Sequence, residues 1–194
     1  MKRSVSTAWF YGLVGLLNLA VAAMFIVVHL PSEPAAVSYM TLPAVVRTEL
    51  ATTPATTGTP IQLVIPSLSL DLPVGIGSYS PQDASWTLDN TQAYYADVSL
   101  PINNSNGTTL IYGHAQSPVF GVLPRIEPGA EAIVHTNNGY VFRYTYVSVK
   151  EVVPTDTSIF TAAGPPTLVL QTCVGPWDAY RGLFSFRFTS LEKQ

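Results

Sequence analysis

The sequence lacks the residue patterns of several common functions. Its single cysteine excludes a disulfide bond within the chain. Only nine lysines and arginines occur, with no basic run beyond Lys2 and Arg3, so a nucleic-acid-binding surface has no electrostatic basis. No glycine-rich phosphate loop, HExxH pattern or CxxC pair is found, which leaves metal and nucleotide chemistry without support. We therefore expect no cofactor, no bound metal and no nucleic-acid partner.

Formal charge is also missing from residues 9–30, which are mostly apolar. A membrane-spanning helix needs roughly 20 such residues. Lys2 and Arg3 precede the segment, and the next lysine or arginine is Arg47. By the positive-inside rule, this asymmetry places residues 1–8 in the cytoplasm and the rest of the chain outside. The segment is therefore predicted to be a single-pass transmembrane signal anchor that holds an extracellular domain at the cell membrane.

Two alternatives to the anchor are weaker. Small residues at positions 20 and 22 resemble a signal-peptide cleavage site, but the apolar run continues past them, beyond the about 7–15 residues of a usual signal-peptide core. A buried helix of a soluble domain would show a polar face at a period of 3.6 residues, which this segment lacks. Residues 31–60 contain five prolines and a stretch rich in alanine and threonine, a composition typical of an extended tether.

The remaining residues, 61–194, are predicted to form one mostly β domain. Short runs rich in β-branched and aromatic residues, separated by Gly, Pro, Asn and Asp, indicate strands at 61–65, 70–74, 109–112, 131–135, 140–149, 167–172 and 183–188. In the run 140–149, Tyr and Phe alternate with other residues, so one aromatic face should point inward. Residues 117–126 and 155–160 could hold short helical turns. We expect a closed antiparallel β-barrel of seven to eight strands.

The single cysteine, Cys173, ends an apolar run that is followed by a Val-Gly-Pro turn sequence. A lone cysteine is usually a small buried hydrophobic residue. Here, however, the run stops at the sulfur, which indicates a presented nucleophile. Arg181 begins the next strand and could stabilise a thiolate or an oxyanion. Arg187 lies deeper in that strand, about 20 Å from Arg181 at ~3.3 Å per residue, so Arg181 is the better candidate.

A histidine has a similar position at the end of another run. His114 follows an apolar strand and precedes an irregular polar stretch, so it is a candidate general acid or base. His135 lies just before an Asn-Asn-Gly turn and is expected to face solvent. A thiol and an imidazole at two strand ends can meet although they are far apart in sequence, as thiol acyl transfer requires. No carboxylate completes a triad. Trp177 and Tyr180, between the cysteine and Arg181, are predicted to line a cleft.

Taken together, these segments resemble the sortase family of membrane-anchored cysteine transpeptidases, and the resemblance covers the whole of 61–194. The residues that carry it are Ile65, Pro66, Leu68, Pro73 and Val74; the run 109–114; Phe120, Leu123, Ile126 and Gly129; Tyr144, Tyr146, Val147, Val153, Pro154 and Asp156; and the run 167–173 with Arg181. Each fragment is short, but their order and spacing are specific. The resemblance implies the same anchor, tether and barrel that the composition predicts.

The resemblance also implies residue roles and partners. The catalytic residues would be His114, Cys173 and Arg181, with Thr172 contributing to substrate binding. The substrate would be an LPxTG-like sorting signal of a secreted protein, cleaved between Thr and Gly through a thioacyl-enzyme and joined to an amine of a cell-wall precursor or a pilin lysine. No cofactor is implied. Two alternatives stay open: a thiol peptidase that releases its product by hydrolysis, and a non-catalytic barrel that binds extended peptides.

Overall fold

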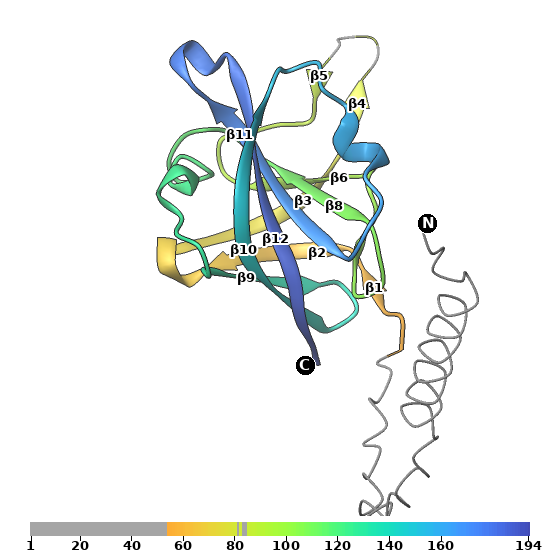
Figure 1. Ribbon diagram of the computed structural model, residues 1–194. Helices are drawn as coiled ribbons and strands as arrows, with labels where there is room; N and C mark the ends of the chain where they lie inside the picture. The colour runs from red at the N-terminus through yellow and green to blue at the C-terminus, as the bar shows by residue number, and fades with distance from the viewer. Residues whose placement is uncertain (1–53, 81, 83–84) are drawn as a thin grey trace, which may run out of the picture. The chain divides into compact units, whose positions relative to one another are not determined.

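The computed structural model describes residues 54–80, 82 and 85–194. Eight strands close into a barrel in the order β10-β12-β11-β8-β6-β3-β2-β9 (Figure 1). The barrel strands are β2 (Pro60–Ile65), β3 (Leu70–Gly77), β6 (Ala93–Ala96), β8 (Thr108–Tyr112), β9 (Glu131–Thr136), β10 (Tyr140–Val152), β11 (Thr167–Val174) and β12 (Tyr180–Lys193). Two small pairs lie outside it: β1 (Thr57–Gly58) with β7 (Ile102–Asn103), and β4 (Tyr79–Ser80) with β5 (Ser85–Trp86).

The described part of the chain contains four short 3-10 turns and is otherwise strand and loop. The turns are η1 (Pro66–Leu68), η2 (Leu123–Arg125), η3 (Ser158–Thr161) and η4 (Pro176–Asp178). The mostly β class and the short helical turns are therefore confirmed. All seven predicted strand runs fall within barrel strands, and η2 and η3 lie within or next to the segments where helical turns were expected.

The barrel is mixed rather than antiparallel, which corrects the sequence prediction. β3 pairs with β6 in parallel, and so does β8 with β11. Parallel pairing requires a crossover connection, which carries the chain from the end of the barrel where the first strand finishes back to the end where that strand began. Between β8 and β11 the crossover contains the whole β9–β10 hairpin, so nothing local in the sequence reveals it. The eighth strand, β6, was missed because it has four residues, two of them alanine, although all four are buried.

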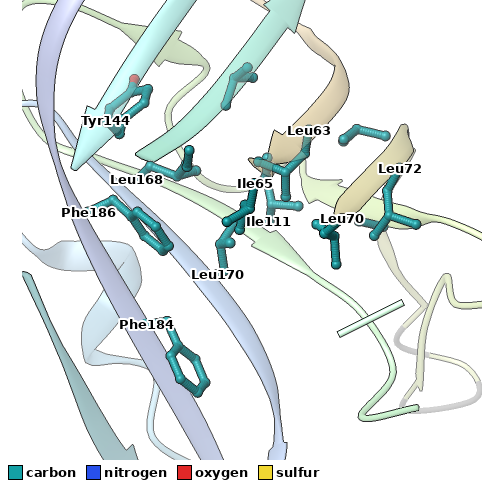
Figure 2. Packing of buried hydrophobic residues seen from close by; sticks show 14 of the residues in the cluster. Leu63, Ile65, Leu70, Leu72, Ile111, Tyr144, Leu168, Leu170, Phe184 and Phe186 are labelled. Atoms are coloured by element: carbon teal, nitrogen blue, oxygen red, sulfur yellow. The ribbon is translucent and has the colours of Figure 1, made fainter. Parts of the chain in front are cut away.

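Alternation in β10 places its aromatic side chains inside the barrel, as the sequence predicts. Phe142, Tyr144 and Tyr146 are at most 7% exposed. On β12, the rings of Phe142 and Tyr144 contact Phe188, and the ring of Tyr146 contacts Phe184 and Phe186. Figure 2 shows members of this cluster converging from β2, β3, β8, β10, β11 and β12. Burial of aromatic and aliphatic side chains from all around the barrel fixes its strands, since each such side chain contributes on the order of 1.5–3 kcal/mol.

A second apolar cluster covers one outer face of the barrel. It contains Leu110 and Tyr112 of β8, Val169 of β11 and Leu183 of β12. The β10–β11 connection packs its Phe160 on this face, and the Phe160 ring stacks on Trp86 at 6.1 Å between ring centroids. Strands β8 and β11 and the first half of β12 are therefore covered by apolar clusters on both sides, which fixes the strand ends at the site described below.

Residues 54–60, at the end of the expected tether, contact the barrel. Thr57 and Gly58 pair with β7, and Pro60 begins β2. The Thr56 amide donates to the Asn104 side chain at 2.8 Å, and the Asn138 amide group donates to the Thr57 carbonyl at 2.7 Å. Such pairing uses backbone groups and polar side chains, so it leaves no apolar pattern in the sequence.

The predicted segments 1–8, 9–30 and most of 31–60 lie outside the described residues. Among the residues that are described, no helix has the length and apolar character needed to cross a membrane. The anchor and its orientation therefore stay predictions.

Candidate active site

The ends of β8, β11 and β12 bring the predicted residues together. In the β11–β12 pair, Cys173 lies directly opposite Arg181. On the other side of β11, the parallel register with β8 ends at Gln171 opposite Tyr112, and the Gly113 amide still donates to the Gln171 carbonyl at 3.1 Å. His114 directly follows Gly113, and Cys173 lies two residues after Gln171. The cysteine is therefore flanked by the backbone segment that leads to the histidine on one side and by the arginine on the other.

Alternation puts the Cys173 and Arg181 side chains on one face of the sheet, and His114 lies two residues beyond the end of the neighbouring strand β8. In a strand, successive side chains point to opposite sides of the sheet. Val169 of β11 and Leu183 of β12 belong to the outer cluster. Cys173 lies four residues after Val169, and Arg181 lies two residues before Leu183, so both side chains point to the side of that cluster. His114 lies two residues after Tyr112, the last residue of β8 and also a member of the cluster. All three are partly exposed, and the thiol is free. The arrangement brings the strand ends that carry a nucleophile, a possible proton carrier and a cation next to one another.

Thr172 connects the two strand ends that carry the histidine and the cysteine. Its side chain is 2% exposed, and its hydroxyl donates to the Gly113 carbonyl at 2.9 Å. Because parallel pairing has already ended at this point, the side chain replaces the missing ladder contact. The hydroxyl thus sets the spacing between the backbones of His114 and Cys173, whereas its predicted contact with substrate stays a prediction.

We expect Thr172→Val to weaken both the fold and the site. The substitution leaves the Gly113 carbonyl buried without a donor, which costs about 1–3 kcal/mol. Urea unfolding should show this loss, and the rate at which Cys173 reacts with substrate should fall. Thr172→Ser retains the hydroxyl and is the matched control. Equal unfolding free energies for the Val and Ser variants would contradict the assigned role.

The loop after β8 holds the histidine from its backbone. The Phe120 amide donates to the His114 carbonyl at 2.9 Å, and Phe120 itself is fully buried. Gly113 allows this fold-back, because a Cβ there would lie 2.7 Å from Cγ1 of Val119. Glycine is therefore needed directly before the histidine, since any side chain would push the loop away from the strand end.

Arg181 binds the turn that follows the cysteine. Its Nη1 donates to the carbonyls of Asp178 at 3.0 Å and Tyr180 at 3.1 Å. In that turn, Trp177 and Asp178 have φ values of 53° and 57°, in the left-handed region that costs non-glycine residues of order 1 kcal/mol or more. The guanidinium thus stabilises a strained turn while lying beside the cysteine.

A groove of about 550 Å³ opens at the barrel mouth next to Cys173. Its walls come from the loop after β8, the end of β10, the end of β11 and the η4 turn. The residues that line it are Ala115, Phe120, Gly121, Pro124, Ile126, Tyr146, Val149, Glu151, Thr172, Cys173, Val174, Gly175, Asp178 and Phe184. The groove surface is divided evenly between polar and apolar atoms, and Cys173 is among its lining residues, as in a site for a small ligand or a peptide.

The sequence-predicted site residues divide into two groups in relation to this groove. Cys173 and Thr172 line it, whereas His114 and Arg181 do not: Arg181 lies opposite Cys173 in the β11–β12 pair, and His114 follows the end of the neighbouring strand β8. Trp177 is 98% exposed and Tyr180 43% exposed, and neither side chain lines the groove. Their predicted role in binding substrate is therefore not supported by contact with this groove and stays a prediction.

Glu151 is the groove residue that sequence reasoning passed over. A bulge between Tyr146 and Ser148 shifts the alternation of β10, so that Val149 and Glu151 take the side that Tyr146 occupied before it. A bulge of this kind inserts one residue and reverses the facing of those after it. Without the bulge, the alternation would place Glu151 away from the groove.

The loop between β10 and β11 is shaped by its own polar groups. The Ser158 amide donates to the Asp156 carboxylate at 2.8 Å. Hydrogen bonding from the Ser158 side chain, and then from this amide, lowers the pKa of Asp156. Within the part of the chain that the structure describes, no group of three His, Cys, Asp or Glu side chains is placed to hold a metal ion.

Comparison with known proteins gives one family. A family profile described as the sortase domain matches residues 63–185, more than half of the chain. Solved structures similar to this one include sortase C1 from Streptococcus suis, at 18% identity over 69% of this chain and 74% of that one, with a TM-score of 0.55. Sortase C from Clostridium perfringens is similar at 17% identity over 70% and 72%, with a TM-score of 0.55. Sortase A from Listeria monocytogenes is similar at 17% identity over 72% and 92%, with a TM-score of 0.56. No curated protein sequence matches.

Proposed function

The chain belongs to the sortase family of cysteine transpeptidases, and we propose that it cleaves an LPxTG-like sorting signal between Thr and Gly and transfers the acyl part to an amine. The observation that carries this proposal is the placement of Cys173 opposite Arg181 and next to the backbone segment that leads to His114, at three adjacent strand ends. A thiol, an imidazole and a guanidinium in this arrangement are the groups that acyl transfer needs.

In the first half-reaction the Cys173 thiolate attacks the Thr carbonyl carbon of the signal. The new C–S bond forms as the carbonyl π electrons move onto oxygen, and the Arg181 guanidinium donates hydrogen bonds to that oxyanion. His114 then gives a proton to the Gly nitrogen as the C–N bond breaks. The products are a thioacyl-enzyme and a released peptide that begins with Gly.

In the second half-reaction an amine resolves the thioester. Its nitrogen attacks the same carbonyl carbon, His114 accepts the proton that the nitrogen loses, and the C–S bond breaks to return the thiolate. Water at ~55 M competes with the amine, so transfer requires a positioned acceptor and some hydrolysis is expected.

The outer face beside the three residues offers a path for an extended peptide. The β10–β11 connection packs Ile159 and Phe160 on this face, and we propose that it forms a wall for the peptide. A signal lying along this wall would bring its Thr carbonyl to the thiol. Membrane anchorage through 9–30, with the catalytic domain outside the cell, is part of the same proposal, since sorting signals belong to secreted proteins.

The experiment is to incubate the full-length chain with a library of Leu-x-x-Thr-Gly peptides, with and without oligoglycine or a lysine amine, and to analyse it by mass spectrometry. We expect an adduct on Cys173 with the mass of the signal up to Thr, and a ligated product that depends on the amine. Cleavage without ligation would favour the hydrolytic peptidase. Peptide binding with neither adduct nor cleavage would favour the non-catalytic barrel.

A further inference from the structure

The groove beside Cys173 carries charge of one sign. Of its lining residues, Glu151 and Asp178 are the two with a formal charge, and both are acidic. They come from different walls, Glu151 from the end of β10 and Asp178 from the η4 turn after β11. The rest of the lining is apolar or neutral, so little in the groove offsets their field.

Glu151 is placed so that its carboxylate stays available. It lies opposite Gly182 of β12, which has no side chain, and Gly182 in turn lies opposite Thr172. Its chain neighbours Lys150 and Val152 point to the other side of the strand, where they face Leu183 and Arg181. The carboxylate therefore projects over bare backbone towards the cysteine end of β11, with the nearest cations on the opposite face.

Neither carboxylate is neutralised within residues 54–80, 82 and 85–194. The ion pairs found there join Arg143 to Glu131 and Glu192, on a different part of the barrel. Arg181, the closest cation to Asp178 in sequence, uses Nη1 on the carbonyls of Asp178 and Tyr180 rather than on a carboxylate. The groove thus presents two unpaired anions at the edge where the thioester would form.

We propose that Glu151, assisted by Asp178, recognises the incoming acceptor as a primary ammonium and that this groove is its route to the thioester. The inference rests on the proposed transfer reaction and adds the acceptor's entry side and charge class. The carboxylates hold R–NH₃⁺ near the site, the ammonium gives one proton to neutral His114, and the freed lone pair attacks the thioester carbon. The second N–H proton leaves the tetrahedral intermediate to solvent as the C–S bond breaks and the Cys173 thiolate departs.

The donor peptide is a less suitable occupant of this groove. Its reactive Thr carbonyl must meet the donors of Arg181. Arg181 is paired across the strands with Val152 and Cys173, and these three residues point to the outer face of the sheet. Glu151, Gly182 and Thr172 are paired with one another in the same way and point to the opposite face. Donor and acceptor can therefore approach the sulfur from two sides, which avoids competition for one space.

The test measures how the thioacyl-enzyme partitions between amine and water. The full-length chain is acylated with the peptide identified above, oligoglycine amide is added, and ligated and hydrolysed products are counted by mass spectrometry. Only acylated enzyme enters this ratio, so a slower first step or a smaller folded fraction does not change it. The variants are Glu151→Gln, the double variant Glu151→Gln/Asp178→Asn, and Glu127→Gln as a control for an exposed carboxylate outside the groove lining.

We expect the ligation-to-hydrolysis ratio to fall about two- to fivefold in Glu151→Gln, because an ion pair between exposed groups contributes little binding free energy. The ratio should fall further in the double variant and stay unchanged in the control. In wild type the ratio should also fall between 0.05 M and 1 M NaCl, because the screening length shrinks to about 3 Å, and the double variant should lose this dependence.

Wild-type ratios and salt dependence in the double variant would overturn the inference and leave the transferase function intact. A changed rate of acylation with an unchanged ratio would place the carboxylates on the donor side and overturn it as well. No adduct with any peptide would overturn the proposed function and this inference together.

Discussion

Cys173→Ala is expected to abolish transfer while the variant still binds the sorting peptide. The sulfur is the group that forms the covalent intermediate, and removal of a catalytic nucleophile typically lowers turnover by more than about 10⁴-fold. The side chain is partly exposed at a strand end, and the neighbouring Thr172 hydrogen bond does not involve it, so the fold should persist. Mass spectrometry should detect no acyl adduct, and fluorescence anisotropy of a labelled peptide should give a Kd within a few-fold of wild type.

Cys173→Ser is the companion variant. It retains a hydroxyl at the same position, but an alcohol is a far weaker nucleophile than a thiolate unless a base activates it strongly. We expect peptide binding with little or no turnover. Cleavage at the wild-type rate in the alanine variant would remove the thioacyl mechanism, and loss of peptide binding in both variants would indicate that the cysteine shapes the peptide-binding surface rather than reacting.

The features of the fold that the sequence could predict are those with a local pattern. Strand runs and the inward aromatic face of β10 follow from alternation over a few residues, and both are found in the structure. The parallel pairing of β8 with β11 could not be predicted this way, because it depends on a crossover that contains the β9–β10 hairpin. Strand β6 has too few residues for alternation to stand out.

The candidate site shows the same division. Cys173 and His114 could be selected because each ends an apolar run, and a run that stops at a reactive side chain is visible in sequence. The register that puts Arg181 opposite Cys173 was anticipated only as proximity, and the structure adds the pairing itself. Glu151 could not be recognised as a groove residue. The side of the strand to which it points depends on the bulge between Tyr146 and Ser148, and no pattern in the sequence marks this bulge.

Arg181→Lys is expected to slow acylation by about 10²–10³-fold, the usual effect of removing one well-placed oxyanion donor. Lysine keeps the positive charge, but a compact ammonium does not reproduce the planar fork of the guanidinium. In this structure the fork has a second task, because Nη1 holds the carbonyls of Asp178 and Tyr180. One side chain thus has to hold the turn after the cysteine and still present donors beside the sulfur, which a single ammonium cannot do at both places.

Arg187→Lys supplies the matched control on the same strand. Arg187 lies opposite Thr167, at the far end of the β11 pairing from Cys173, and is exposed. The same chemical change there should leave the acylation rate within about twofold of wild type. Single-turnover acylation and peptide Kd, measured for both variants, separate the two tasks of Arg181: an oxyanion role lowers the rate at constant Kd, whereas collapse of the η4 turn raises Kd. Equal rates for the two variants would show that the guanidinium beside Cys173 is dispensable, and the catalytic assignment would then rest on His114 and Cys173 alone.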